Sequence, residues 1–291
     1  MTNEWPNQPS INVGNRAFIF GGAYGNLQAT KAVLDKASIS GYSANQIIFT
    51  GDTVAYCGQP QETVNLIRNA GVHVIQGNCE ESLGADSDNC GCGFDEGSTC
   101  NLLSVEWYRY CRSQLDIQTK LWMAGLPQEL IVDIGEFRLN CLHGSPSAIN
   151  EFVFPSDMKL GRFSLSDTSE CDGYIVGHSG IPFLSNVSGK AWINSGSAGM
   201  PANDGTTRIW YATLEARGSQ LIAEIHALEY DYLNAAKAMA EAGLNSGYME
   251  CLSSGIWPSL DVLPDEELTS TGKPLKPQKE AFQRTPLSKV A

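Results

Sequence analysis

The sequence predicts an α/β fold in which two sheets stack as a sandwich, with helices on the outside. The first observation is a unit of apolar strand, Gly-rich turn and helix, which recurs along residues 16–77 and is typical of a parallel sheet. The second is a series of apolar runs in residues 130–227, paired across short Gly-containing turns as in antiparallel hairpins. Both halves are rich enough in apolar residues to form a core.

The strand-to-helix units begin near the N-terminus. They predict strands at 16–20, 47–52 and 72–76 and helices at 27–37 and 61–70. The run from Ile47 to Asp52 is apolar until Gly51, which suits a strand covered on both faces. Because open α/β sheets bind ligands at the carboxyl edge, Asp52 is a candidate site residue. The alternative is that Asp52 only caps the next helix.

The second half contains three predicted hairpins and one short strand. The hairpins pair 130–134 with 137–142, 183–187 with 190–194 and 208–214 with 221–227, and the strand is 174–176. Helices are expected at 102–126 and 230–242. The strands of this half are therefore predicted to be antiparallel.

The composition divides the chain into three parts. Residues 1–15 are expected to form a flexible N-terminal arm, and 16–243 one domain with a Gly-, Asp-, Ser- and Cys-rich insertion at 81–101. Residues 244–291 form a C-terminal extension. Beyond about residue 264 it is rich in Pro, Lys, Thr and Ser, so we expect it to be mobile or draped over the surface.

The charge and hydropathy exclude several classes of protein. A net charge of −13 argues against nucleic acid or an anionic membrane as the main partner. No apolar segment approaches the roughly twenty residues that span a bilayer, and the stretch from Met1 to Ser10 lacks the pattern of a signal peptide. We therefore expect a cytoplasmic protein whose nine cysteines are mostly reduced.

Five predicted strand ends carry Gly and polar residues. In order they are Gly22-Ala23-Tyr24-Gly25-Asn26, Gly51-Asp52, Gly77-Asn78-Cys79-Glu80, His143-Gly144 and Gly177-His178-Ser179-Gly180. This order resembles the calcineurin-like metallophosphoesterase family, in particular its small bacterial phosphodiesterase and phosphatase-like branch. The family's motifs are Asp-x-His, Gly-Asp, Gly-Asn-(His or Cys)-(Asp or Glu), His and Gly-His-x-His. The resemblance runs from Arg16 to Gly199 and implies a four-layer α/β/β/α sandwich of two mixed sheets with a two-metal phosphoesterase site.

The resemblance assigns a complete ligand set to one metal. Asp52 matches the carboxylate that the family shares between its metals, and Asn78, His143 and His178 match the other ligands of one ion. Two oxygens and two imidazoles suit Mn, Fe, Ni or Zn. Asp52, Asn78, His143 and Tyr24 are the candidate catalytic residues. The alternatives are core histidines and a turn asparagine, but the glycines beside them at strand ends favour ligation.

The other metal has lost its own ligands. Where the family has Asp and His in the first motif and His in the last, this chain has Gly22, Tyr24 and Gly180. Since all three belong to one ion, we interpret the pattern as a site emptied selectively, with one firmly held metal per chain and reduced or altered activity. Tyr24 has three interpretations: a hydrogen-bond donor to phosphate, a ligand of ferric iron, or an aromatic plug.

The insertion raises the question of a second metal centre. Cys79, Cys90, Cys92 and Cys100 lie close in sequence, and four thiols can bind zinc or an iron–sulfur cluster. The absence of any Cys-x-x-Cys spacing argues against it. Cys79 also stands where many family members have His, which removes the usual group for protonating the leaving group.

These observations predict a metal-dependent phosphoesterase that hydrolyses a small phosphomonoester or phosphodiester. The alternative is a weak or inactive member that binds a phosphorylated ligand or protein partner, and a third hypothesis is a thiol-based sensor. The expected partner is a small phosphorylated substrate, with no membrane. The pocket walls should come from the insertion and residues 145–171, while the oligomeric state stays open. The aromatic group of Trp107, Tyr108, Tyr110 and Trp122 is assigned to helix packing.

Overall fold

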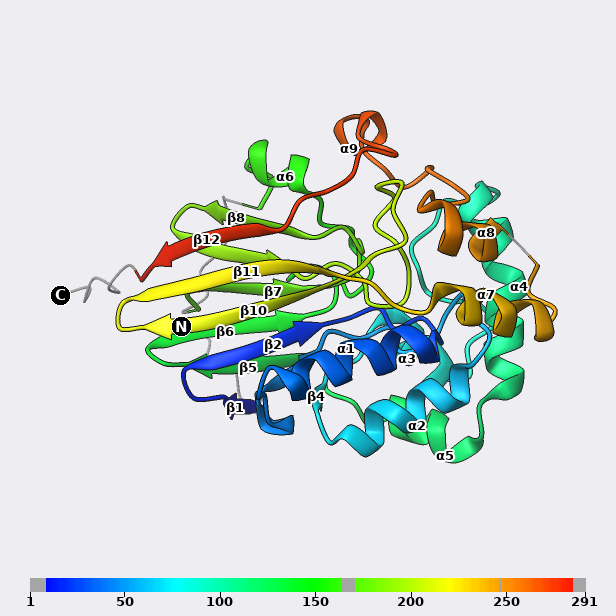
Figure 1. Ribbon diagram of the computed structural model, residues 1–291, viewed down its shortest axis with the longest axis horizontal. Coiled ribbons are helices and arrows are strands. Elements are labelled where there is room, and N and C mark those ends of the chain that lie inside the picture. The colour runs from blue at the N-terminus through cyan, green and yellow to red at the C-terminus, as the bar shows by residue number, and fades with distance from the viewer. Residues whose placement is uncertain (1–8, 164–170, 246, 285–291) are drawn as a thin grey trace.

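The chain folds around two six-stranded sheets (Figure 1). The computed structural model describes residues 9–163, 171–245 and 247–284. One sheet has the order β1-β5-β6-β7-β9-β8, and the other has the order β12-β11-β10-β2-β3-β4. The strands are β1 (Ser10–Asn12), β2 (Arg16–Phe20), β3 (Ile47–Phe49), β4 (His73–Val74), β5 (Glu129–Ile134), β6 (Phe137–Leu142), β7 (Gly173–Val176), β8 (Phe183–Val187), β9 (Lys190–Asn194), β10 (Ile209–Arg217), β11 (Gln220–Leu228) and β12 (Gln278–Gln283).

Helices connect and cover the strands. They are α1 (Leu27–Ile39), the short 3₁₀ helix η1 (Ala44–Gln46), α2 (Pro60–Ala70), α3 (Asn78–Gly84), α4 (Thr99–Gln114), α5 (Ile117–Ala124), α6 (Pro155–Lys159), α7 (Tyr232–Glu241), α8 (Gly247–Ser254) and α9 (Asp265–Thr269). Within the described ranges, no helix combines the length and apolar character required to cross a membrane.

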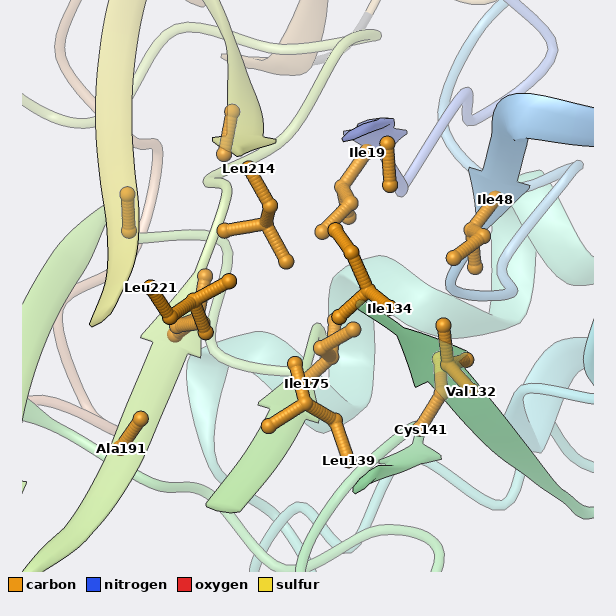
Figure 2. Close-up of a cluster of buried hydrophobic side chains, with 14 of the residues drawn as sticks. Ile19, Ile48, Val132, Ile134, Leu139, Cys141, Ile175, Ala191, Leu214 and Leu221 are labelled. Carbon is orange, nitrogen blue, oxygen red and sulfur yellow. The ribbon is translucent and has the colours of Figure 1, made fainter. Parts of the chain in front are cut away.

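The main core lies between the two sheets. Figure 2 shows Ile19 and Ile48 of one sheet facing Ile134, Val132 and neighbouring side chains of the other. Burial alternates along β5 because successive side chains point to opposite faces, whereas β2 and β3 are buried almost throughout. Burial of two apolar faces against each other is what stacks the sheets.

The outer faces of both sheets are covered by helices, which completes the four layers. Val33 of α1 and Ile67 of α2 pack on Phe18 and Phe49 of β2 and β3. On the opposite side, Met158 of α6 packs in a cluster with side chains of β7, β8 and β9. The predicted α/β/β/α sandwich of two mixed sheets is therefore confirmed.

The sheet that contains β2 has the expected parallel strands. β2 pairs with β3 through Ile19 and Ile48, and β3 pairs with β4 through Phe49 and Val74. All three strands run in one direction, so their carboxyl ends lie at one edge.

The prediction of a separate antiparallel half is wrong. The β10–β11 hairpin joins the sheet of the parallel strands, where β10 lies antiparallel to β2. In the other sheet β6, β7 and β9 pair in parallel. The hairpins themselves are present, but strand pairing between distant segments depends on which faces are buried, and local turn signals do not determine it.

The described end of the expected N-terminal arm is also ordered. Residues 10–12 form β1, which lies parallel to β5, and Val13 is buried in the core. The predicted flexible arm is therefore wrong for residues 10–15, because an edge strand needs few apolar residues when the partner strand supplies the hydrogen bonds. Residues 1–8 lie outside the described residues.

The C-terminal extension is more regular than expected. α9 follows Pro264, and β12 pairs antiparallel with β11 and buries Phe282. The segment beyond about residue 264 is expected to be mobile or draped over the surface, and in the structure residues 265–283 lie against the domain as α9, a connection and the edge strand β12. Its polar composition reflects an edge strand with one solvent-facing side. Residues 285–291 lie outside the described part.

Two smaller expectations also change. The helix predicted at 102–126 is two helices, α4 and α5, and Asp116 caps α5 by accepting a hydrogen bond from the Thr119 amide at 2.6 Å. The insertion is partly helical, because α3 extends through its first residues to Gly84.

Candidate metal centre

Four of the predicted site residues come together at the carboxyl edges of the two sheets. Asp52 follows β3 and Asn78 begins α3 after β4. His143 directly follows β6, and His178 lies in the loop after β7. Two residues therefore come from each sheet, and the site lies where the edges of the two sheets meet.

His143 is the centre of this group. Its Nε2 atom lies 3.2 Å from Asp52 Oδ2, 3.1 Å from Asn78 Oδ1 and 3.1 Å from His178 Nδ1. All four side chains are buried or nearly so. Asp52, His143 and His178 also form the single group of three or more acidic, His or Cys ligands that the described residues bring within 4.8 Å of one another.

The ring of His143 is fixed by the backbone. Its Nδ1 atom lies 2.7 Å from the carbonyl oxygen of Thr50, and because a carbonyl only accepts, Nδ1 donates this hydrogen bond. In the neutral ring Nε2 then carries a lone pair directed at Asp52, Asn78 and His178. This carbonyl contact is the kind of support that orients metal-binding histidines.

The orientation of Asn78 is set by the insertion. Its Nδ2 atom donates to the carbonyl oxygen of Cys90 at 3.0 Å and lies 3.3 Å from Cys92 Sγ. Asn78 Oδ1 is therefore turned toward the histidines. The loop that accepts this bond is closed by a disulfide between Cys90 and Cys92.

The donor set fits a divalent transition metal. A carboxylate oxygen, an amide oxygen and an imidazole nitrogen meet at one place, and they are satisfied there by a bound cation or by a proton on His143 Nε2. Ligand atoms that each lie about 2.0–2.2 Å from one ion are about 3.0–3.5 Å from their neighbours. The separations around His143 Nε2, 3.1 to 3.2 Å, match that spacing.

The protonation equilibria of the site are strongly coupled. Burial tends to raise the pKa of Asp52, but the facing His143 outweighs it and the pKa lies below its usual value. Burial lowers the pKa of His143 and the Asp52 carboxylate raises it, and the resulting pKa lies above the usual value. Burial, together with His143, lowers the pKa of His178 to about 3. His178 is therefore neutral at physiological pH and is able to act as a ligand.

Glu80 holds the loops that carry the ligands, although sequence reasoning gave it no role. Its fully buried carboxylate accepts hydrogen bonds from the amides of Asp52 and Gly77, both at 2.8 Å, and Thr53 at 2.5 Å. The signal was its position three residues after Gly77, at the start of α3, where a side chain reaches back to the preceding turn.

The turn at Asp52 needs two glycines. Asp52 itself has φ +60° and Gly51 has φ +91°. A Cβ atom at Gly51 would lie 2.6 Å from the Gly77 nitrogen, and one at Gly77 would lie 2.5 Å from Asp52 Oδ1. The close approach of these two loops is what places Asp52 next to Asn78.

Tyr24 occupies the region of the missing ligands. A Cβ atom at Gly22 would lie 2.6 Å from Tyr24 Cζ, and one at Gly180 would lie 3.5 Å from the Tyr24 hydroxyl oxygen. The ring packs against Tyr56, with centroids 4.9 Å apart. Burial and the nearby Asp52 raise the pKa of Tyr24 well above 10, so the phenol keeps its proton. This geometry favours the plug over a tyrosinate ligand of iron.

A narrow pocket opens beside Asp52 and His178, with a cavity volume of about 60 Å³. Phe94 of the insertion and Phe152 of the 145–171 segment line it, as expected from the sequence. The C-terminal extension supplies further walls, Tyr248 and Trp257, which sequence reasoning missed. Their contribution depends on the extension folding back over the site, which no local pattern reveals.

The remaining candidates lie elsewhere. Trp107 and Tyr108 are buried in a helical core cluster, as expected. The described residues contain no group of three thiols close enough to hold a metal. Six cysteines of the described chain are free thiols: Cys57, Cys79, Cys100, Cys111, Cys141 and Cys251. The Cys90–Cys92 disulfide is the only exception to the expected reduced state within the described chain.

The layered fold and a buried Asp, Asn and two His at its sheet edges define the class of metal-dependent phosphoesterases. Residues 24–219 match the model of the calcineurin-like phosphoesterase superfamily domain, and the chain belongs to this family. An uncharacterised protein of Methanocaldococcus jannaschii is 26% identical over 226 residues, which are 72% of this chain and 85% of that protein.

Two solved structures share the fold. A metallophosphoesterase from Sphaerobacter thermophilus has a TM-score of 0.65 and 23% identity, covering 84% of this chain and 100% of its own. A hypothetical protein from Pyrococcus horikoshii has a TM-score of 0.67 and 18% identity, covering 82% of this chain and 98% of its own.

Proposed function

We propose that this protein is a metal-dependent phosphoesterase that hydrolyses a small phosphoester with one firmly held divalent metal. The proposal depends on one observation: Asp52, Asn78 and His178 all approach the Nε2 atom of His143. Membership of the calcineurin-like family supports a hydrolytic role for such a site.

Asp52, Asn78, His143 and His178 would hold the ion. The chemistry that a divalent ion would supply there is polarisation of a phosphoryl oxygen and a lower pKa of a water molecule. The Thr50 carbonyl keeps the His143 ring in its ligating orientation, and Glu80 keeps Asp52 beside it. These contacts leave the site formed before a substrate arrives.

The substrate would bind in the adjoining pocket. Tyr24 lines this pocket together with Asp52 and His178, and its protonated hydroxyl supplies a hydrogen-bond donor for a phosphoryl oxygen. Cys79 is a poor proton donor, because burial and the nearby Asp52 carboxylate raise the pKa of its thiol well above the usual value. Substrates with good leaving groups are therefore favoured.

Metal analysis and turnover test the proposal together. Elemental analysis of the purified chain should give one equivalent of transition metal, and the protein supplied with Mn²⁺ should hydrolyse nitrophenyl phosphoesters. His143→Ala and His178→Ala should each lower metal affinity at least about tenfold and abolish turnover. His226→Ala, a histidine in β11 far along the chain from the motifs, is the matched control and should leave both unchanged.

Turnover that survives both ligand substitutions would show that hydrolysis does not occur at this centre, and a metal-loaded protein without turnover would refute the hydrolase. The alternative is a binding module, and the observation in its favour is that Tyr24 fills the region of the second ion, so that the clamp of a two-metal site is missing. Calorimetry would then show metal-dependent binding of a phosphorylated ligand with no product formed.

A further inference from the structure

The pocket beside the metal centre carries an unusual charge pattern for a phosphoester site. Among the residues that the structure describes, none of those lining it is Lys or Arg, and its ionisable members near the centre are Asp52 and His178. Phosphate sites in proteins normally pair the phosphoryl charge with Arg, Lys or helix N-termini. In this pocket the metal would be the only positive charge facing a substrate, with the neutral Tyr24 hydroxyl as a hydrogen-bond donor beside it.

Counting charges distinguishes the two ester classes. A divalent ion bound by one carboxylate leaves a net charge of about +1, because Asn78 and the neutral histidines add none. A phosphodiester carries one negative charge and balances it. A phosphomonoester above about pH 6 carries nearly two, and the extra charge would be buried without a partner. Glu80, buried behind Asp52, makes any excess negative charge less favourable still.

The walls of the pocket are aromatic. Tyr56 stacks on Tyr248 with ring centroids 4.1 Å apart, and Phe152 lies 4.3 Å from the ring of His178. Phe94 and Trp257 complete the lining and are only half-buried. Half-buried aromatic rings around a polar centre mark a binding surface for an apolar or aromatic group.

From these observations we infer that the preferred substrate is a small phosphodiester monoanion that carries an aromatic group, rather than a phosphomonoester. The cavity of about 60 Å³ has room for a single phosphoryl group beside the metal centre, so the aromatic group would lie outside it, against the half-buried rings of Phe94 and Trp257. The inference rests on the proposed function, since it assumes that the metal centre engages the phosphoryl group.

Binding to the Mn²⁺-loaded protein tests the inference without relying on turnover. Calorimetry at pH 8 should show diphenyl phosphate binding at least about tenfold more tightly than phenyl phosphate, because only the second is a dianion. The difference should shrink toward pH 5.5, where phenyl phosphate becomes a monoanion. Dimethyl phosphate should bind more weakly than diphenyl phosphate at both pH values, since it lacks the rings.

Two substitutions of Phe94 distinguish the effect of an added positive charge on ligand binding from the effect of the aromatic ring. Phe94→Ala should weaken diphenyl phosphate binding more than dimethyl phosphate binding. Phe94→Lys should strengthen phenyl phosphate binding relative to Phe94→Ala, because it supplies the missing positive charge. Leu121→Lys on the exposed face of α5 adds the same charge away from the pocket, and it should change neither affinity.

Turnover of matched nitrophenyl esters tests the hydrolase function and the preference for a phosphodiester separately. A higher kcat/KM for bis(4-nitrophenyl) phosphate than for 4-nitrophenyl phosphate supports both. A higher value for the monoester, or equal binding of phenyl and diphenyl phosphate at pH 8, overturns the substrate class and leaves the hydrolase intact. Preferential diester binding with no turnover of either ester refutes the hydrolase and retains the ligand preference.

Discussion

The ring of Tyr24 occupies the space into which a side chain at Gly22 would project. A Cβ atom at Gly22 would lie 2.6 Å from Tyr24 Cζ and 2.7 Å from its hydroxyl oxygen. The two departures from the family's first motif are therefore one structural change, because the large residue at one position requires the smallest at the other. Gly180 completes the arrangement, since a Cβ atom there would lie 3.5 Å from the same hydroxyl oxygen.

Gly22→Ala should destabilise the protein through this contact. The new methyl group meets the Tyr24 ring, and Gly22 has φ +57°, so we expect a loss of about 1–3 kcal/mol in the free energy of unfolding. Urea denaturation measures it. In a Tyr24→Ala background the same change should cost less by at least about 0.5 kcal/mol. Strict additivity of the two substitutions would show that the ring and the methyl group do not meet.

Restoring the family's ligands should restore a second ion. The variant Gly22→Asp, Tyr24→His, Gly180→His removes the phenol and returns the three lost ligands, so metal analysis should rise from one to two equivalents per chain. Tyr24→Phe is the control, because it keeps the ring and supplies no ligand. A stoichiometry of one in the triple variant, with the fold intact by circular dichroism, would contradict the assignment of this region.

Glu80→Gln should lower the stability of the protein and weaken metal binding, although Glu80 is not a proposed metal ligand. A glutamine has one acceptor oxygen for the three amides that Glu80 now satisfies, so at least one buried N–H loses its partner at a cost of about 1–3 kcal/mol. Calorimetry should also show weaker Mn²⁺ binding, since Asp52 is no longer held. The neighbouring Glu81→Gln, whose side chain accepts an exposed hydrogen bond from Gln128, should stay within about 0.5 kcal/mol of the parent.

The metal-free protein should lose stability as the pH falls from 6.5. His178 has its pKa lowered by burial to about 3, so between those values the unfolded chain binds a proton that the folded chain excludes. Stability from this residue is complete above pH 6.5 and declines toward pH 3. His178→Gln should reduce the slope of the free energy of unfolding against pH by about one proton, or about 1.4 kcal/mol per pH unit. Urea titrations between pH 6 and 4.5 in the presence of a chelator measure this slope. Equal slopes of unfolding free energy against pH for the parent and the variant would contradict the lowered pKa of His178.

His143 and Asp52 act in opposite directions in the same experiment. The raised pKa of His143 gives stability that is present at low pH and is lost as the pH rises through that pKa. The lowered pKa of Asp52 gives stability that is lost only as the pH falls through it. Both groups remain in the His178→Gln variant, so the comparison measures the loss of the His178 proton together with its electrostatic effect on Asp52 and His143.

The strand ends could be predicted because their signal is local. A buried apolar run followed by Gly and a polar residue places Asp52 or His143 at a sheet edge whatever the rest of the chain does. The sheet that the β10–β11 hairpin joins was not predictable in this way, because it is decided by burial against β2. β12 was missed because an edge strand with one face in water lacks a strong apolar pattern.

Parts of the site were equally hidden. The role of Glu80 requires three amides from two loops to meet one carboxylate, which sequence spacing shows only in part. The walls formed by Tyr248 and Trp257 depend on a segment that leaves the domain and returns over the pocket. The sequence therefore indicated which four side chains come together, whereas it did not indicate the shape of the pocket.

The C-terminal extension has an evolutionary consequence. The family match ends at residue 219, while Tyr248 and Trp257 lie beyond it and β12 anchors their segment to the edge of the sheet. Insertions or deletions in that segment can redraw the outline of the pocket while the four ion-binding side chains stay where they are. Selectivity in this lineage is thus free to drift separately from the chemistry, and homologues with identical ligands but different tails should differ in what they accept.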